Sequence, residues 1–182
     1  MLAGKNVTLR MIQEEDLPEM LHLMNDLQHR GDYLGVELHH ETKIQKYYAD
    51  AGFWENDFGR MLIVDKSGRL LGSITFFKGV GDSEGYEIGF QIYKKEDRGK
   101  GYATEALQLF CSYLFDLKPI QRLQICTAKE NAGARRMAEK CGFVFEGTMR
   151  RAFFARGKYH DLDFLSLLRE ECTPLKDVLA KE

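Results

Sequence analysis

The segment with the clearest chemical potential places two glycines just before a predicted helix. Arg98, Gly99, Lys100 and Gly101 precede a helical stripe that starts at Ala103. The first N–H groups of a helix have no partner within it, and the helix dipole adds partial positive charge at that end. Glycines let the backbone approach an anion closely, and the two cations can add charge. The spacing therefore predicts a phosphate-binding turn, although a glycine pair before a helix can equally be a plain tight turn.

A strand and a helix must position this turn. Residues 86–93 have the composition of a strand and feed into the turn, and after it apolar residues recur at helical spacing until Pro119 ends the helix. Further strands are predicted over residues 7–11, 60–64, 70–77, 122–126, 143–145, 152–155 and 162–168. Further helices are predicted from an N-cap at Asp16, over 41–51 with an end near Gly52, and over 131–140. This order predicts a mixed α/β architecture with a partly antiparallel sheet.

Two turns between these strands are predicted to close β-hairpins. Residues 65–68 are a four-residue turn, and residues 79–85 form a glycine-rich connection. The second resembles a phosphate-binding loop only superficially, because it lacks the Gly-Lys-Ser/Thr ending and leads into a strand. Mononucleotide binding there is the weakest of the functions considered.

Length and composition predict one domain over residues 1–182. Hydrophobic residues make up 44% of the 182 and charged residues 30%, which suffices for one buried core. We expect a cytoplasmic protein, because neither a signal-peptide core nor a membrane-spanning apolar run is present. Four separated cysteines and no clustered histidines predict reduced thiols and no metal. No basic stripe interleaved with aromatics suggests nucleic-acid binding.

The net charge of −2 conceals an asymmetry. Residues 1–60 carry 6 Lys and Arg against 11 Asp and Glu, and the remaining residues carry 20 against 17. The asymmetry can simply reflect a solvated surface. The functional alternative is that residues 1–60 face a cationic ligand and the remaining residues face an anionic one.

The glycine turn and a second motif together resemble a known superfamily. Arg98-x-x-Gly101-x-Ala103, preceded by Glu-Ile-Gly-Phe and followed by Thr-Glu-Ala, resembles the coenzyme A pyrophosphate loop of the Gcn5-related N-acetyltransferases (GNAT). Residues 131–143 resemble the second signature of that superfamily, an Asn that opens a helix ending in Gly-Phe. The stretches 7–10 and 15–17 are similar to its opening strand and helix. Residues 147–150 and 161–171 resemble the branch that includes ribosomal-protein N-terminal acetyltransferases.

The resemblance implies a fold and a cosubstrate. The fold is a central mixed, mostly antiparallel sheet of about seven strands with helices on both faces. Strand 86–93 splays from strand 122–126, and acetyl-coenzyme A enters the gap. The backbone of Ile92 and Tyr93 then pairs with pantetheine, and the N–H of Tyr93 polarises the thioester carbonyl. The pyrophosphate is held by Arg98, Gly99, Lys100, Gly101, Tyr102 and Ala103. Asn131 either reaches the coenzyme or is simply the N-cap of its helix. The resemblance also implies a possible homodimer, which is common in this superfamily.

Acetylation of an amine requires the neutral amine, whereas an alkyl amine is mostly protonated at neutral pH. Glu87, on the strand expected to form the cleft wall, is the candidate general base. The alternative for Glu87 is a polar residue that faces solvent or bonds a neighbouring strand. No general acid is assigned, since the expected Tyr or Ser is absent from the helix after Asn131. Tyr93, Tyr102 or Tyr159 could substitute, or the coenzyme thiolate could leave unaided.

The acceptor pocket implied by the resemblance uses the first two helices and the loop between them. Asp32, Tyr33 and Trp54 are the candidate substrate-binding residues, in a region acidic and aromatic enough for a cationic amine. The predicted function is acetyl transfer to a protein N-terminus, a polyamine or a small-molecule amine. The alternatives are transfer of a different acyl group and a non-catalytic acyl-coenzyme A binding module.

Overall fold

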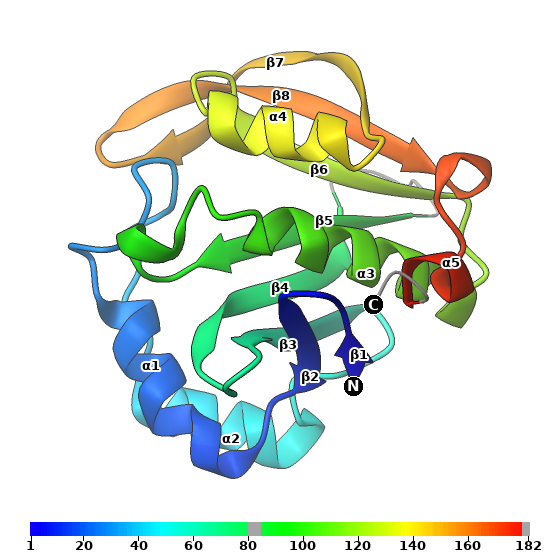
Figure 1. The fold of residues 1–182 in the computed structure, drawn as a ribbon. Coiled ribbons are helices and arrows are strands. Elements are labelled where there is room, and N and C mark those ends of the chain that lie inside the picture. The colour runs from blue at the N-terminus through cyan, green and yellow to red at the C-terminus, as the bar shows by residue number, and fades with distance from the viewer. Residues whose placement is uncertain (80–84, 180–182) are drawn as a thin grey trace.

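An eight-stranded sheet organises the molecule in the order β1-β2-β3-β4-β5-β6-β8-β7 (Figure 1). The computed structural model describes residues 1–79 and 85–179. All strand pairs are antiparallel except β5 with β6, so the predicted mixed, mostly antiparallel sheet is confirmed. The strands are β1 (Leu2–Ala3), β2 (Val7–Met11), β3 (Phe58–Asp65), β4 (Leu70–Lys78), β5 (Gly85–Ile92), β6 (Arg122–Ala128), β7 (Val144–Ala155) and β8 (Lys158–Leu168).

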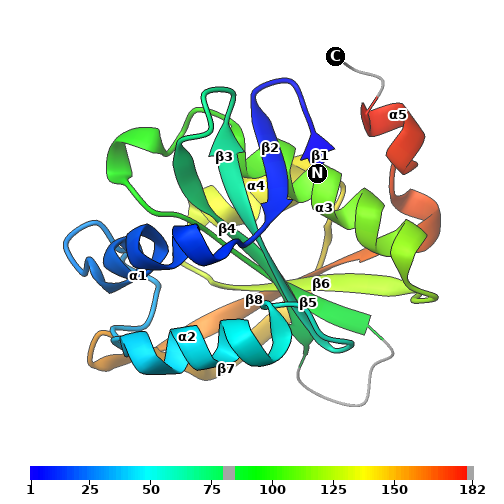
Figure 2. The same cartoon turned by 90° about the horizontal axis from the view of Figure 1, so that it is seen from below.

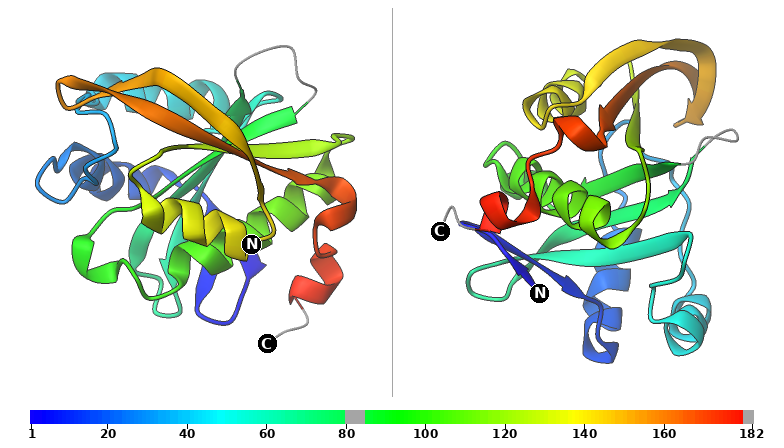
Figure 3. Two further views of the ribbon diagram at one scale, coloured as in Figure 1. Left: turned by 90° about the horizontal axis from the view of Figure 1, so that it is seen from above. Right: turned by 90° about the vertical axis from the view of Figure 1, so that its right-hand side faces the viewer.

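Helices cover both faces of the sheet, as predicted (Figures 2 and 3). They are α1 (Leu17–Asn25), α2 (Glu41–Ala51), α3 (Tyr102–Leu117), α4 (Ala132–Lys140) and α5 (Leu175–Leu179). Buried residues of α1 and α2 pack with Leu62 and Val64 of β3 in one apolar cluster. The larger cluster, which joins α3 and α4 to the sheet, includes Leu9 and Ile63 from the opposite face. Adjacent β3 residues thus enter different clusters, as alternation in a strand requires.

The strands β5 and β6 diverge part-way along their length. They pair in parallel only over Gly85, Tyr86 and Glu87, opposite Arg122, Leu123 and Gln124. Beyond that point β5 remains paired with β4, while β6 remains paired with β8. The predicted splay is therefore present, and Glu87 lies where it begins.

Most predicted elements are confirmed, but β8 begins four residues before the predicted 162, and β1 and α5 were not predicted. Further differences concern Asp16 and β7. Helix α2 has the predicted bounds and ends at Gly52, which has φ +56°. Asp16 does not cap α1 through its side chain. Its carboxylate instead binds Arg10 at 2.6 Å and accepts from the Gln13 N–H at 2.8 Å. The two predicted strands at 143–145 and 152–155 are parts of one long strand, β7. The 65–68 hairpin turn is confirmed, whereas residues 80–84 of the predicted 79–85 loop lie outside the described part.

Candidate active site

The glycine turn has the backbone geometry that its sequence requires. Gly99 and Gly101 have φ of +74° and +86°, where a Cβ would be strained. A Cβ built on either glycine would meet no atom within 4 Å, so the surface above the turn is open. Helix α3 follows directly, and the N–H of Glu105 donates to Gly101 O at 3.1 Å. The N–H groups of Tyr102 and Ala103, which the sequence singled out, therefore belong to the first turn, where helices lack internal partners.

A buried carboxylate that the sequence did not single out holds this turn in place. Asp97 is 3% exposed and accepts two hydrogen bonds from the Arg69 guanidinium, at 2.7 and 3.0 Å. The ammonium of Lys100 lies 3.6 Å from the same carboxylate. Hydrogen bonding from Arg69 is the main reason that the pKa of Asp97 is lowered. Lys100 thus contacts Asp97 as well as lying beside the predicted anion site.

Replacement of the Asp97 carboxylate by an amide is expected to remove a contribution to folding stability that the wild type itself loses at low pH. Because the folded-state pKa of Asp97 is lowered, its stabilisation is present above the unfolded pKa and is lost as the pH falls through the folded pKa. Asp97→Asn should therefore lower Tm at pH 7, and the difference from wild type should shrink towards pH 3. Differential scanning calorimetry over this range measures it. A Tm difference that is independent of pH would contradict the assignment.

Arg98 points back into the protein. Its guanidinium donates to Ile92 O at 3.1 Å and to Tyr93 O at 3.0 Å, and it also donates to His29 O. Burial lowers its pKa. Arg98 therefore ties the end of β5 to the loop between α1 and α2, a role that the sequence analysis did not predict.

Glu87 lies at the divergence of β5 and β6. Its neighbours in the sheet are Phe77 on β4 and Gln124 on β6. The side chain is half-buried, and burial raises the pKa of the carboxyl, while the nearby side chains of Cys126 and Gln124 oppose that shift. A carboxylate with a raised pKa beside an opening between strands is suited to accept a proton.

The backbone N–H of Tyr93 does not have the orientation that was expected. It donates to Leu71 O on β4 at 2.9 Å. The backbone groups of successive residues in a strand point alternately to its two neighbours. Since the Tyr93 N–H points to β4, the N–H of the preceding residue, Ile92, faces the gap towards β6. The geometry thus disfavours the Tyr93 N–H as the thioester ligand and favours that of Ile92.

Asn131 caps helix α4. Its Oδ1 accepts from the Ala134 N–H at 3.2 Å, so the structural role considered from the sequence is present. A contact of Asn131 with the coenzyme stays a prediction.

The three candidate acceptor residues do not come together. Tyr33 donates to Glu130 O at 3.2 Å, next to Asn131, and neighbouring Asp32 is exposed in the same loop. Trp54 packs instead against Phe76, with ring centroids 5.2 Å apart, as part of the core on the α3 side. Trp54 is accordingly a packing residue in this arrangement.

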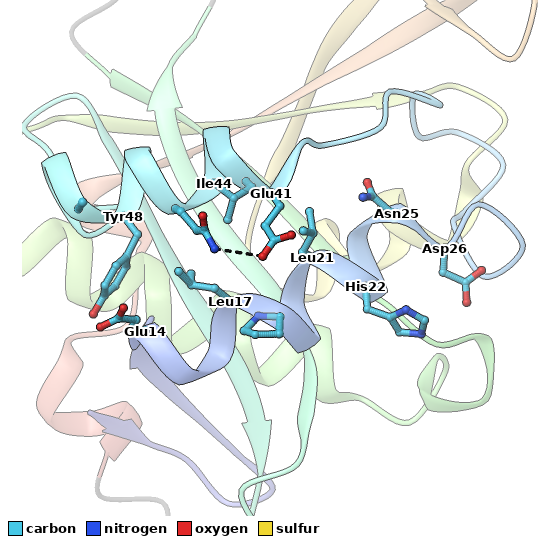
Figure 4. Close-up of a pocket in the computed structure, with 12 residues that line it drawn as sticks. Glu14, Leu17, Leu21, His22, Asn25, Asp26, Glu41, Ile44 and Tyr48 are labelled. Carbon is cyan, nitrogen blue, oxygen red and sulfur yellow. Dashed lines mark hydrogen bonds between the residues drawn. The ribbon is translucent and has the colours of Figure 1, made fainter.

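A groove runs between α1 and α2 (Figure 4). It has a volume of about 1030 Å³ and is lined by apolar residues such as Leu17 and by the carboxylates of Glu14, Asp26 and Glu41. Glu87 is not among its lining residues, so this groove is separate from Glu87.

Residues 1–79 and 85–179 contain no group of three or more His, Cys, Asp or Glu side chains arranged to hold a metal. No helix in the same part of the chain is long and apolar enough to cross a membrane. Burial raises the pKa of Cys141 to about 12, so its thiol is protonated and packed rather than nucleophilic.

Known proteins are similar to this chain in both sequence and fold. The model of the acetyltransferase (GNAT) domain matches residues 6–144. A Bacillus subtilis protein provisionally named ribosomal N-acetyltransferase YdaF is 30% identical over 92% of this chain and 94% of its own. The spermidine N(1)-acetyltransferase of Vibrio cholerae is 25% identical over 92% and 96%. A crystal structure of spermidine N-acetyltransferase from Vibrio cholerae, in complex with CoA and spermine, superposes with a TM-score of 0.78 at 24% identity, over 91% of this chain and 96% of that one. The chain therefore belongs to the GNAT acetyltransferase family and is an acetyl-coenzyme A-dependent N-acetyltransferase.

Proposed function

We propose that the chain transfers the acetyl group of acetyl-coenzyme A directly to a primary amine in a ternary complex, with Glu87 as general base. The observation that carries this proposal is the half-buried carboxylate of Glu87 at the point where β5 and β6 separate. The glycine turn and the start of α3 follow the far end of the same strand. One strand therefore connects a proton acceptor to an anion site.

The coenzyme would occupy the gap and the turn. Pantetheine would lie between β5 and β6, with the Ile92 N–H polarising the thioester carbonyl. The pyrophosphate would bind the backbone of residues 99–103 at the α3 N-terminus. Asn131, at the start of α4, would contact the coenzyme through the amide nitrogen that its capping bond leaves over.

The reaction then needs one base and no dedicated acid. Glu87 takes a proton from the ammonium, and the amine nitrogen attacks the thioester carbon. A tetrahedral intermediate forms and its C–S bond breaks. The nitrogen loses its second proton, which the coenzyme thiolate takes up after it has left, so the products are the amide, the coenzyme thiol and protonated Glu87. A thiol pKa of about 8.5 allows the thiolate to leave unaided. Among the tyrosines considered as acids, the Tyr93 hydroxyl is buried beneath α1 and α2, and Tyr159 is 66% exposed.

Two acceptor classes have support from relatives. Spermidine acetyltransferases are similar in sequence and fold, and the acidic loop between α1 and α2 suits a polyamine. The relationship to YdaF supports a protein N-terminus. Both are primary amines that the same base can deprotonate.

Acetyl-coenzyme A is expected to raise Tm. Ligand at 100 times Kd stabilises a protein by about 2.7 kcal/mol, which corresponds to roughly 5–10 °C for a chain of this size. Differential scanning fluorimetry measures the shift, with ATP as the control anion. No shift at 1 mM acetyl-coenzyme A would contradict both the catalytic proposal and a binding module.

A panel of amines, with release of the coenzyme thiol as readout, separates a catalyst from a binding module. Propionyl- and succinyl-coenzyme A in the same assay test the acyl group. Binding without thiol release from any amine would favour the binding module.

A further inference from the structure

A cation without a carboxylate partner lies beneath α1 and α2. The Arg60 guanidinium is 5.7 and 5.9 Å from the ring centroids of Phe53 and Phe58, and its Nη1 is 3.7 Å from Met24 Sδ. Its Nε is buried and has no hydrogen-bond partner among the described residues. None of the ion pairs within that part of the chain includes Arg60. The guanidinium thus carries its charge among aromatic rings and a thioether.

A second polar group without a partner lies in the same cluster. The hydroxyl of Tyr93 is buried and makes no hydrogen bond of full geometry to the described residues. Burial raises its pKa, while the nearby Ser73 side chain and the charge of Arg60 oppose that shift. Buried donors are nearly always satisfied in folded proteins, because an unsatisfied donor loses its hydrogen bonds to water without gaining others. A ligand that accepts hydrogen bonds could satisfy both donors of this cluster.

These groups share the face of the sheet that carries Glu87. Arg60 is the register partner of Thr75, which in turn is the partner of Gly89 on β5. Glu87, Gly89 and Tyr93 are separated by even numbers of residues, so their side-chain directions coincide. Two strand spacings place the Arg60 backbone about 10 Å from β5. Part of the Arg60 residue remains accessible.

We propose that Arg60 and the Tyr93 hydroxyl form an anion subsite of the acceptor pocket, and that the preferred acceptor is an amine that also carries a carboxylate or phosphate. This inference rests on the proposed function. A guanidinium binds either oxyanion by paired hydrogen bonds, and the distance between Arg60 and β5 suits an acceptor whose amine and anion are several bonds apart. A polyamine would instead bring another cation to Arg60, a repulsive contact.

Matched acceptors test the subsite, because lysine and cadaverine differ only by a carboxylate. The further arms are ornithine against putrescine, phosphoethanolamine against ethanolamine, and spermidine. Thiol release gives kcat/KM for each. Hydrogen bonds to a charged group contribute about 1.5–3 kcal/mol, so we expect the member of the preferred pair that carries the carboxylate or phosphate to be favoured 10- to 100-fold. The lysine and phosphoethanolamine arms distinguish a carboxylate from a phosphate.

Variants then assign the preference to Arg60. In Arg60→Gln the ratio of kcat/KM between the member that carries the oxyanion and the member that lacks it should fall 10- to 100-fold, mainly through KM. Arg60→Lys keeps the positive charge and should retain part of the kcat/KM ratio. If the glutamine variant does not fold, the lysine variant is used for the test instead. Arg10→Gln is the control, because Arg10 is already paired with Asp16 at 2.6 Å, and it should leave the ratio unchanged.

Preference of the wild type for cadaverine, putrescine or spermidine would overturn the subsite while leaving the proposed function intact. An unchanged ratio in Arg60→Gln would also overturn it. No thiol release from any amine would instead overturn the proposed function itself.

Discussion

Replacement of Glu87 by glutamine is expected to lower kcat at neutral pH by two to four orders of magnitude, the usual contribution of a general base. The amide is nearly isosteric with the carboxyl group but cannot accept the ammonium proton. Binding of acetyl-coenzyme A should change little, since the proposed coenzyme contacts are backbone groups of residues 92 and 99–103 and the side-chain amide of Asn131.

The pH profile gives the sharper test. Burial raises the pKa of Glu87, so the fraction of active carboxylate, and with it kcat/KM, rises as the pH passes through that pKa. Glu87→Gln should lose this acidic limb and recover part of its rate at high pH, where the amine is already neutral. Glu19→Gln, on the exposed side of α1, is the control. Wild-type rates for Glu87→Gln at both neutral and high pH would show that Glu87 is not the base.

Features with local physical causes could be predicted from the sequence. Helix α2 has its predicted bounds because Gly52 adopts a left-handed conformation that ends a helix. The 65–68 turn and the glycine turn before α3 likewise depend on neighbouring residues. The sequence analysis placed Glu87 on the strand that splays from residues 122–126 because a family resemblance related these distant strands, and its role as base stays a prediction.

Features that depend on distant contacts could not be predicted. Asp97 is neutralised by Arg69, 28 residues earlier, and Arg98 donates to His29 O, 69 residues earlier. Periodicity predicts that Ile92 and Tyr93 point in opposite directions, but only the pairing with β4 decides which N–H faces the gap. Trp54 looked like a binding residue because aromatic side chains serve both pockets and cores, and its contact with Phe76 settles its place.

The structure shows where part of the charge asymmetry of the sequence lies. Acidic side chains of the first 60 residues line the outer groove between α1 and α2 (Figure 4). The inner side of the same two helices covers Arg60, which also belongs to that part of the chain. A net charge summed over a segment therefore says little about the sign that an acceptor meets beside Glu87.

Gly101→Ala is expected to weaken acetyl-coenzyme A binding at least tenfold. An added Cβ at φ +86° is strained and costs roughly 1–2 kcal/mol in the left-handed region. Relief of that strain rotates the peptide units whose N–H groups face the predicted pyrophosphate, and a Cβ enters the open space above the turn. Isothermal titration with acetyl-coenzyme A measures the loss.

Gly157→Ala separates this loss from general destabilisation. Gly157 lies in the β7–β8 turn, has φ +81°, and its Cβ would also meet no atom within 4 Å. Both variants should therefore lose a similar amount of Tm in the absence of ligand. Only Gly101→Ala should also lose affinity, because only its backbone lies at the start of α3. Equal losses of affinity in the two variants would mean that the glycine turn serves the fold alone, and the pyrophosphate site would have to be placed elsewhere.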